Sequence, residues 1–346
     1  MKKVLSLLMC ALFLLSALTV CVNAASKTAL PTSAGLSALR GQFSSGTAPK
    51  TEGFTLDYKY YSPVGSGDSN KYPIVIFLHG IGHGEYAGSQ LADSGMAYWA
   101  SSELQSRFIN GGAFILLPRC PENLNIFWGD SLIGPLHALI DDFIKQHKNN
   151  VDTTRIAISG SSQGGAMVWN MVDAYPEYFS AAFPIASTES PSANVLKRAS
   201  GTAVWLIASS KDPVINYTVI TKPLWNRVCE NNAHPENCRL STLGTVYNPD
   251  GSKSSDNHHL AGVITYDLHT LQNGKYPDMT TVDGTGRTVD LASPNGLIKW
   301  ISSVQSGFTG DNGSSGSNVN VLKRIIDVFR NLLLEIVHIV QMLLGL

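Results

Sequence analysis

Residues 160–164 read Gly-Ser-Ser-Gln-Gly, the G-x-S-x-G pattern of a nucleophile elbow. In that motif the central serine, here Ser162, lies on a sharp turn between a strand and a helix, and its hydroxyl is exposed. Glycines flank the serine because the turn leaves no room for side chains. Residues 155–159 (RIAIS) have the apolar pattern of a short buried strand, and residues 164–169 (GGAMVW) are expected to begin a helix. The sequence therefore predicts Ser162 as a nucleophile.

The pattern by itself is weak evidence, because the chain has 31 glycines and a partial match, GSSG, recurs at residues 313–316. The alternative is that Ser162 is an incidental turn residue. The strand before it and the helix after it favour the nucleophile.

Strands alternate with helices along the chain, which predicts an α/β fold with a mainly parallel sheet and helices on both faces. The apolar runs at 72–78 and 113–118 indicate strands buried on both faces. Further strands are expected at residues 54–61, 155–159, 179–186, 203–208, 240–247 and 261–267, and helices at 91–108, 132–147, around Val195, 217–231 and 295–304.

A serine nucleophile requires a base, and the base requires an orienting carboxylate. Asp212 follows the predicted strand 203–208, so it is expected at the carboxyl edge of the sheet, the same edge as Ser162. The alternative role for Asp212 is to cap the next helix.

The base is harder to choose. If strand 240–247 is parallel, the loop after it brings His258 and His259 to the carboxyl edge of the sheet, where Ser162 is expected. Of these two histidines we favour His258. If strand 261–267 is the parallel one, His269 takes the role instead. His338 is expected on the surface.

The oxyanion of an acyl-transfer intermediate needs preorganised N–H donors. We expect the backbone N–H of Gln163 and that of Ile81, or failing that Gly80, to supply them. His79 and His83 have a ligand-like spacing without a third ligand nearby, so no metal site is predicted. Trp128 is expected either to line a pocket or to pack in the core.

The charge balance argues against a nucleic-acid partner. Removing Lys2 and Lys3 lowers the 25 basic residues to 23 against 26 acidic ones, a net charge of −3. Charged residues make up 15% of the chain, which favours an uncharged or mildly polar substrate.

The chain divides into five expected segments. Residues 1–24 have a basic start, an apolar run and a small-residue cleavage frame, which predicts a secretory signal peptide. Residues 25–52 are expected to be a flexible lead-in, 53–305 the catalytic domain, and 306–320 a Gly/Ser linker. Residues 321–346 form an expected amphipathic helix that lies on a membrane surface, self-associates or docks on the domain. The protein is thus expected to be secreted or associated with the cell surface.

Three cysteines follow the predicted cleavage site. In an oxidising compartment Cys229 and Cys238 are candidates for a small-loop disulfide, which would leave Cys120 unpaired. The alternative is three buried thiols.

The segments around Leu78-His79-Gly80, 152–156, 160–165 and 210–214 resemble the α/β-hydrolase superfamily. They are similar to secreted feruloyl and acetyl xylan esterases, polyhydroxybutyrate-depolymerase-like proteins and peptidases of the prolyl-oligopeptidase type. The resemblance implies hydrolysis of carboxylic esters through an acyl-enzyme, without a cofactor. The chain departs from these families at residues 257–260 (NHHL), where they usually have Gly-His with a tryptophan soon after.

The combined hypothesis is a secreted serine esterase acting on small esters or acylated plant polysaccharides. The alternatives are a serine peptidase with the same machinery, or a non-catalytic surface-binding protein on a hydrolase fold.

Overall fold

The computed structural model describes residues 33–65, 68–80, 96–121, 128–246, 258–260, 278–291 and 296–306. The predicted signal peptide, the C-terminal amphipathic helix, nearly all of the linker and the expected strand at 261–267 lie outside these residues. Within the described residues, no helix is both long and apolar enough to cross a membrane.

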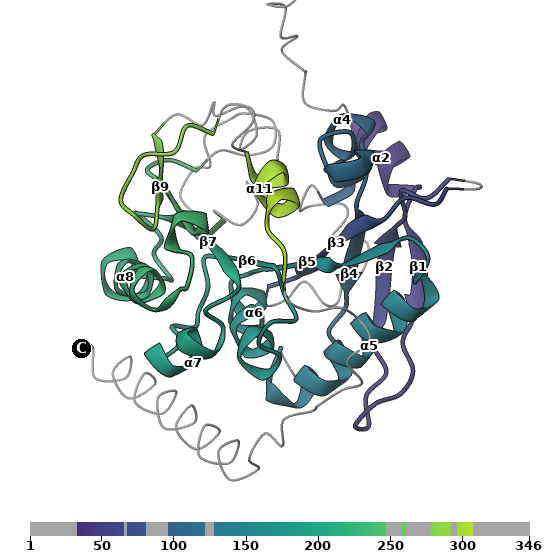
Figure 1. The fold of residues 1–346 in the computed structure, drawn as a ribbon, viewed down its shortest axis with the longest axis horizontal. Coiled ribbons are helices and arrows are strands. Elements are labelled where there is room, and N and C mark those ends of the chain that lie inside the picture. Colours follow the sequence, from purple (N-terminus) through teal and green to yellow (C-terminus); the bar gives the residue numbers. More distant parts are fainter. Residues whose placement is uncertain are drawn as a thin grey trace, which may run out of the picture. The chain divides into compact units, whose positions relative to one another are not determined.

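A mixed sheet, parallel throughout its centre, organises the described part of the chain (Figure 1). The strand order is β1-β2-β4-β3-β5-β6-β7-β8-β9; neighbouring strands from β4 to β8 pair in parallel, and β1, β2 and β9 add antiparallel edges. This arrangement is the predicted α/β class. The strands are β1 Ser44–Thr47, β2 Asp57–Tyr61, β3 Tyr72–Leu78, β4 Phe114–Pro118, β5 Val151–Ser161, β6 Ala181–Ile185, β7 Ala203–Ser209, β8 Arg239–Leu243 and β9 Met279–Asp283.

The sheet reverses its winding direction at β3. Strand β4 lies on one side of β3, and β5 lies on the other, with Leu78 in register with Gly160 at the carboxyl ends. In open parallel sheets, ligands bind in the crevice outside the carboxyl ends at such a switch point. The topology therefore places the Gly160–Gly164 motif where a site is expected.

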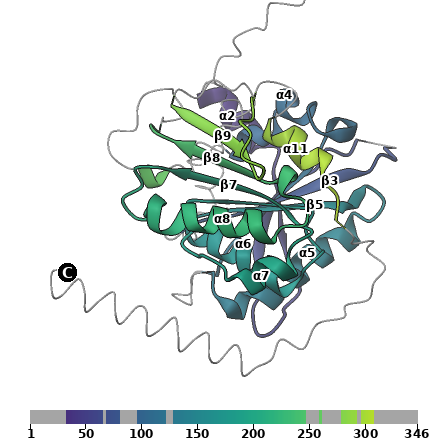
Figure 2. The same ribbon diagram turned by 60° about the vertical axis from the view of Figure 1, so that its left-hand side comes forward.

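Helices cover both faces of the sheet (Figures 1 and 2). Helices α5, α6, α7 and α8 lie on one face, and α2, α4 and α11 lie on the other. Their bounds are α2 Ser33–Arg40, α4 Ser102–Gln105, α5 Ile133–Gln146, α6 Gln163–Ala174, α7 Ala193–Arg198, α8 Lys222–Asn231 and α11 Leu297–Ser303; short 3-10 segments are η1 Met96–Ala100, η2 Ile109–Gly111, η4 Asp130–Leu132, η6 Pro235–Asn237 and η7 His258–Leu260, and η5 Tyr217–Thr221 is a π-helix.

The core is split by the sheet into two layers. Along β3, Val75 and Phe77 pack into the layer that contains Trp300 of α11, whereas Ile74 and Ile76 pack into the layer that contains α5. All residues of β3 are buried. A strand covered on both faces needs apolar side chains at every position, which explains why residues 72–78 read as a continuous apolar run.

The edges of the sheet differ from the sequence-based expectation. Part of the expected flexible lead-in instead forms α2 and β1. This part is ordered because β1 pairs with β2, and because Phe43, between α2 and β1, packs into the core. Strand β9, absent from the prediction, pairs with β8. Residues 96–105, part of the single helix expected at 91–108, form η1 and α4 separated by Ser101, which caps α4 through its hydroxyl.

Among the described residues, Cys120, Cys229 and Cys238 form no disulfide. The expected Cys229–Cys238 disulfide is therefore not formed. The alternative of three buried thiols holds for Cys120 and Cys238, whereas Cys229 is only partly buried. Burial raises the pKa of the Cys120 thiol to about 11 and that of the Cys238 thiol to about 12. Thiols with such pKa values are poor nucleophiles at neutral pH.

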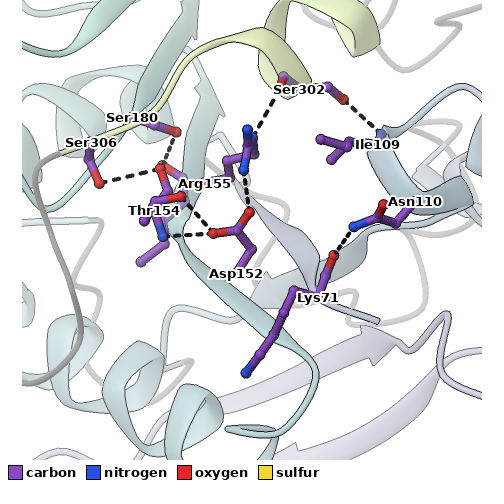
Figure 3. A network of polar contacts seen from close by, with 10 residues as sticks. Lys71, Ile109, Asn110, Asp152, Thr154, Arg155, Ser180, Ser302 and Ser306 are labelled. Atoms are coloured by element: carbon purple, nitrogen blue, oxygen red, sulfur yellow. Dashed lines mark hydrogen bonds and ion pairs between the residues drawn. The ribbon is translucent and has the colours of Figure 1, made fainter. Parts of the chain in front are cut away.

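A polar network fastens the last described helix to the start of β5, at the opposite end of the strand from Ser162 (Figure 3). Arg155 pairs with Asp152 and donates from Nε to the Ser302 carbonyl at 3.0 Å. The Ser306 N–H donates to the Thr154 carbonyl at 2.8 Å. Both charged side chains are largely buried, so the network depends on keeping the pair intact.

Replacing Arg155 by alanine is expected to lower the free energy of unfolding by about 2–3 kcal/mol, because it leaves the Asp152 carboxylate unpaired and the Ser302 carbonyl without its donor. Urea denaturation measures the change. The matched control is Arg198→Ala, whose side chain is 42% exposed and pairs with the partly exposed Asp173, with an expected loss below about 1 kcal/mol. Equal losses in the two variants would contradict the role given to Arg155.

Candidate active site

The turn between β5 and α6 holds Ser162 in an uncommon backbone conformation. Its φ is 54° and its ψ is −114°, which for a residue other than glycine costs on the order of 1–3 kcal/mol. The Ser162 N–H donates to the Ile185 carbonyl at 2.8 Å, and the Ala166 N–H donates to the Ser162 carbonyl at 3.2 Å. The surrounding backbone therefore maintains the turn that the sequence predicted.

The glycines of the motif are required by backbone packing. A Cβ on Gly160 would lie 2.4 Å from the carbonyl group of Gly164, and a Cβ on Gly164 would lie 2.3 Å from the Leu78 carbonyl oxygen. Both contacts are shorter than real Cβ atoms tolerate. The first turn of α6 thus lies directly against the ends of β5 and β3.

Three side chains from separate loops meet at this edge of the sheet. His259 of η7 lies with Nε2 3.0 Å from the Ser162 hydroxyl and Nδ1 2.9 Å from Oδ2 of Asp212. For the Ser162 hydroxyl to donate to Nε2, the imidazole must carry its proton on Nδ1, which then donates to Asp212. This is the geometric arrangement of a Ser-His-Asp triad.

Asp212 is held rigidly and is buried. Its Oδ1 accepts hydrogen bonds from the N–H groups of Val214 at 2.8 Å and Ile215 at 2.9 Å, leaving Oδ2 for His259. Burial acts to raise the pKa of the Asp212 carboxyl, but the hydrogen bonds from His259, Ile215 and Val214 outweigh it, so the pKa lies below its ordinary value. Asp212 thus holds His259 through Oδ2 and closes the turn after β7 through Oδ1. The alternative role, capping the next helix, belongs to Asn216.

The structure reverses the order of preference within the histidine pair. His258, favoured over His259 by the sequence, lies with Nδ1 3.0 Å from the hydroxyl of Ser209. Neighbouring residues of one 3-10 turn point in different directions, so only one of the two faces Ser162. The third candidate, His269, lies outside the described residues.

The expected oxyanion donors are partly described. Gln163 is the first residue of α6, where backbone N–H groups have no intrahelical acceptor and the helix dipole favours negative charge. Ile81 lies outside the described residues. Gly80 just before it is ordered by His79, whose Nδ1 donates to the Gly80 carbonyl at 2.8 Å.

Both ring nitrogens of His79 are occupied by the backbone, because Nε2 also accepts from the Cys120 N–H at 3.1 Å. Trp128 donates from Nε1 to the His79 carbonyl at 2.9 Å and is 3% exposed, so it packs in the core rather than lining a pocket. The sequence predicted none of these three partners of His79. His83 lies outside the described residues, and the described residues hold no cluster of three metal-ligating side chains.

Comparison with protein families matches residues 60–234 to the phospholipase/carboxylesterase family. The chain belongs to this α/β-hydrolase family. The matched region covers half of the chain and contains Ser162 and Asp212, but it ends before His259.

Among solved structures, this α/β-hydrolase is similar to one described as a thermostable esterase. The two share 25% sequence identity with a TM-score of 0.54, over 67% of this chain and 62% of that one. The chain thus spans less than two thirds of the length of that esterase. No curated protein matches the chain significantly.

Replacing Gly164 by alanine is expected to destabilise this hydrolase by about 3 kcal/mol or more, because the added methyl group meets the Leu78 carbonyl. Thermal denaturation measures the effect. The control is Gly201→Ala, where a Cβ meets nothing within 4 Å, and which should change stability by less than about 1 kcal/mol. A Gly164→Ala variant as stable as the wild type would disprove the close approach of α6 and β3.

The lowered pKa of Asp212 predicts how stability changes with pH. Because the pKa is lower in the folded state, the carboxylate stabilises the fold above the ordinary carboxyl pKa of about 3.9, and this contribution is lost as the pH falls through the folded-state value. The stability difference between wild type and Asp212→Asn should therefore be largest near pH 7 and shrink towards pH 3. Urea titrations across this range measure it. A difference that grew on acidification would have the wrong sign.

Proposed function

We propose that the protein is a serine esterase in which Ser162 is the nucleophile, His259 the base and Asp212 the orienting carboxylate. One observation carries the proposal, the continuous hydrogen-bonded chain from the Ser162 hydroxyl through His259 to Asp212, at 3.0 and 2.9 Å. The family match supports hydrolysis of a carboxylic ester as the reaction.

In the proposed reaction, His259 Nε2 takes the proton of the Ser162 hydroxyl as the oxygen attacks the ester carbonyl. The alcohol leaves with that proton, and an acyl-enzyme remains on Ser162. Water, deprotonated by the same nitrogen, then releases the acid and restores the serine. Asp212, kept ionised by its hydrogen bonds, stabilises the imidazolium formed in each half of the reaction.

The negative charge that develops on the carbonyl oxygen needs donors beside Ser162. Gln163, at the positive end of α6, is proposed as one of them. Ile81 remains the proposal for the second donor, with Gly80 as the alternative. The hydrogen bonds of His79 favour a fixed backbone at this position.

The substrate and the location are proposals from the sequence. The similarity to secreted feruloyl and acetyl xylan esterases supports small esters or acylated plant polysaccharides as substrates. The signal-like residues 1–24 support export, with residues 321–346 as a candidate contact to a membrane surface or to a second copy. A peptidase with the same triad is the alternative.

Turnover of short-chain and feruloyl esters tests the proposal. Ser162→Ala and His259→Ala should each lower kcat by about 10⁴-fold or more, because neither residue works without the other. His269→Ala should retain most of the activity.

Three results would contradict the proposal. Wild type that turns over no ester but cleaves an aminoacyl anilide would favour the peptidase. Loss of activity in His269→Ala with retention in His259→Ala would reassign the base. Wild type inactive on both substrate classes would favour a binding protein.

A further inference from the structure

The end of β7 and the turn after it contact the two neighbouring histidines of η7. Ser209 bonds His258 and Asp212 bonds His259, each through Nδ1. We propose that His258 and Ser209 are positioning residues, which hold η7 in the orientation where His259 reaches Ser162. This inference rests on the proposed function and adds a second attachment for the base.

A single attachment would leave the orientation of η7 poorly determined. The 3-10 helix spans only His258–Leu260, and so short a turn has little intrinsic stability. Three residues make one 3-10 turn, so the side chains of His258 and His259 project about 120° apart. Contacts made in directions this far apart resist rotation about the axis of the turn more strongly than the contacts of His259 do without them.

The anchor for His258 belongs to the rigid sheet. Ser209 is the last residue of β7, is fully buried, and lies in register with Leu243 of β8. The Ser209 hydroxyl also accepts a hydrogen bond from the N–H of Lys211 at 3.2 Å. The residue just before Asp212 is therefore bound to the same oxygen as His258. The two partners of the histidine pair are therefore fixed relative to each other by one hydroxyl.

The consequence for catalysis follows from the sensitivity of proton transfer to geometry. His259 must lie within hydrogen-bond reach of Ser162 when the ester is attacked, and a displacement of about 1 Å costs on the order of a hundredfold in rate. Loss of the Ser209–His258 contact should therefore reduce kcat and leave substrate binding largely unchanged.

Two substitutions of His258 separate positioning from general packing. Asparagine places a polar atom where histidine has Nδ1, whereas glutamine places one where histidine has Nε2. His258→Gln should lower kcat, per active site titrated with a fluorophosphonate, by about tenfold to a hundredfold with KM changed less than about twofold. His258→Asn should stay within about threefold of wild type in kcat.

A double-mutant cycle tests whether the contact with Ser209 is responsible. Ser209→Ala should lower kcat as His258→Gln does, and the double variant should be no slower than the slower single variant, because both remove the same interaction. His234→Gln changes a histidine that is 63% exposed and precedes the amino end of β8, away from the carboxyl edge where the site lies, and it serves as the control with unchanged kcat.

The outcomes separate this inference from the proposed function. Wild type that neither reacts with the fluorophosphonate nor hydrolyses esters would defeat the proposed function itself. If the wild type is active and His258→Gln has the same kcat, the inference would be overturned while the proposed function would stand. Equal losses in His258→Asn and His258→Gln, or multiplicative losses in the cycle, would also overturn it.

Discussion

The close approach of α6 to the end of β3 is the constraint on which the site depends. With a Cβ at Gly164 the Leu78 carbonyl would be only 2.3 Å away, so only glycine allows the helix to begin there. Ser162, the residue before this helix, connects it to β5 with φ 54°. In an elbow of this kind the serine hydroxyl is exposed. The same contact sets the start of α6 beside His79, whose carbonyl oxygen would lie 2.6 Å from a Cβ at Gly164.

The parallel sheet brings distant residues to this constraint. Ser162 follows β5 and Asp212 follows β7, while His259 lies between β8 and β9. Parallel neighbours end at the same edge, so each loop enters the site from the same side. Buried polar groups at this edge are costly unless they are paired, and Asp212 meets that requirement with donors to both of its oxygens.

Much of this arrangement is readable from the sequence, and the reasons for the exceptions are physical. Apolar runs reveal strands covered on both faces, such as β3, whereas β1 (SSGT) and β9 (MTTVD) are short and polar and have no such signal. The motif indicates Ser162, and the end of an apolar strand indicates Asp212. The choice between His258 and His259 depends on the rotation of a single turn, which no periodicity encodes. For Trp128, the sequence indicated an apolar, aromatic side chain but not the group to which its indole N–H would donate.

The central claim is that the Ser162 hydroxyl is activated by His259. The most direct measurement is peptide mapping by mass spectrometry after reaction of the whole protein with a fluorophosphonate, carried out on wild type and on His259→Ala. The account predicts a single adduct on Ser162 in wild type and a strongly slowed reaction in the variant. An adduct on another residue, or one that forms on Ser162 equally fast without His259, would contradict it.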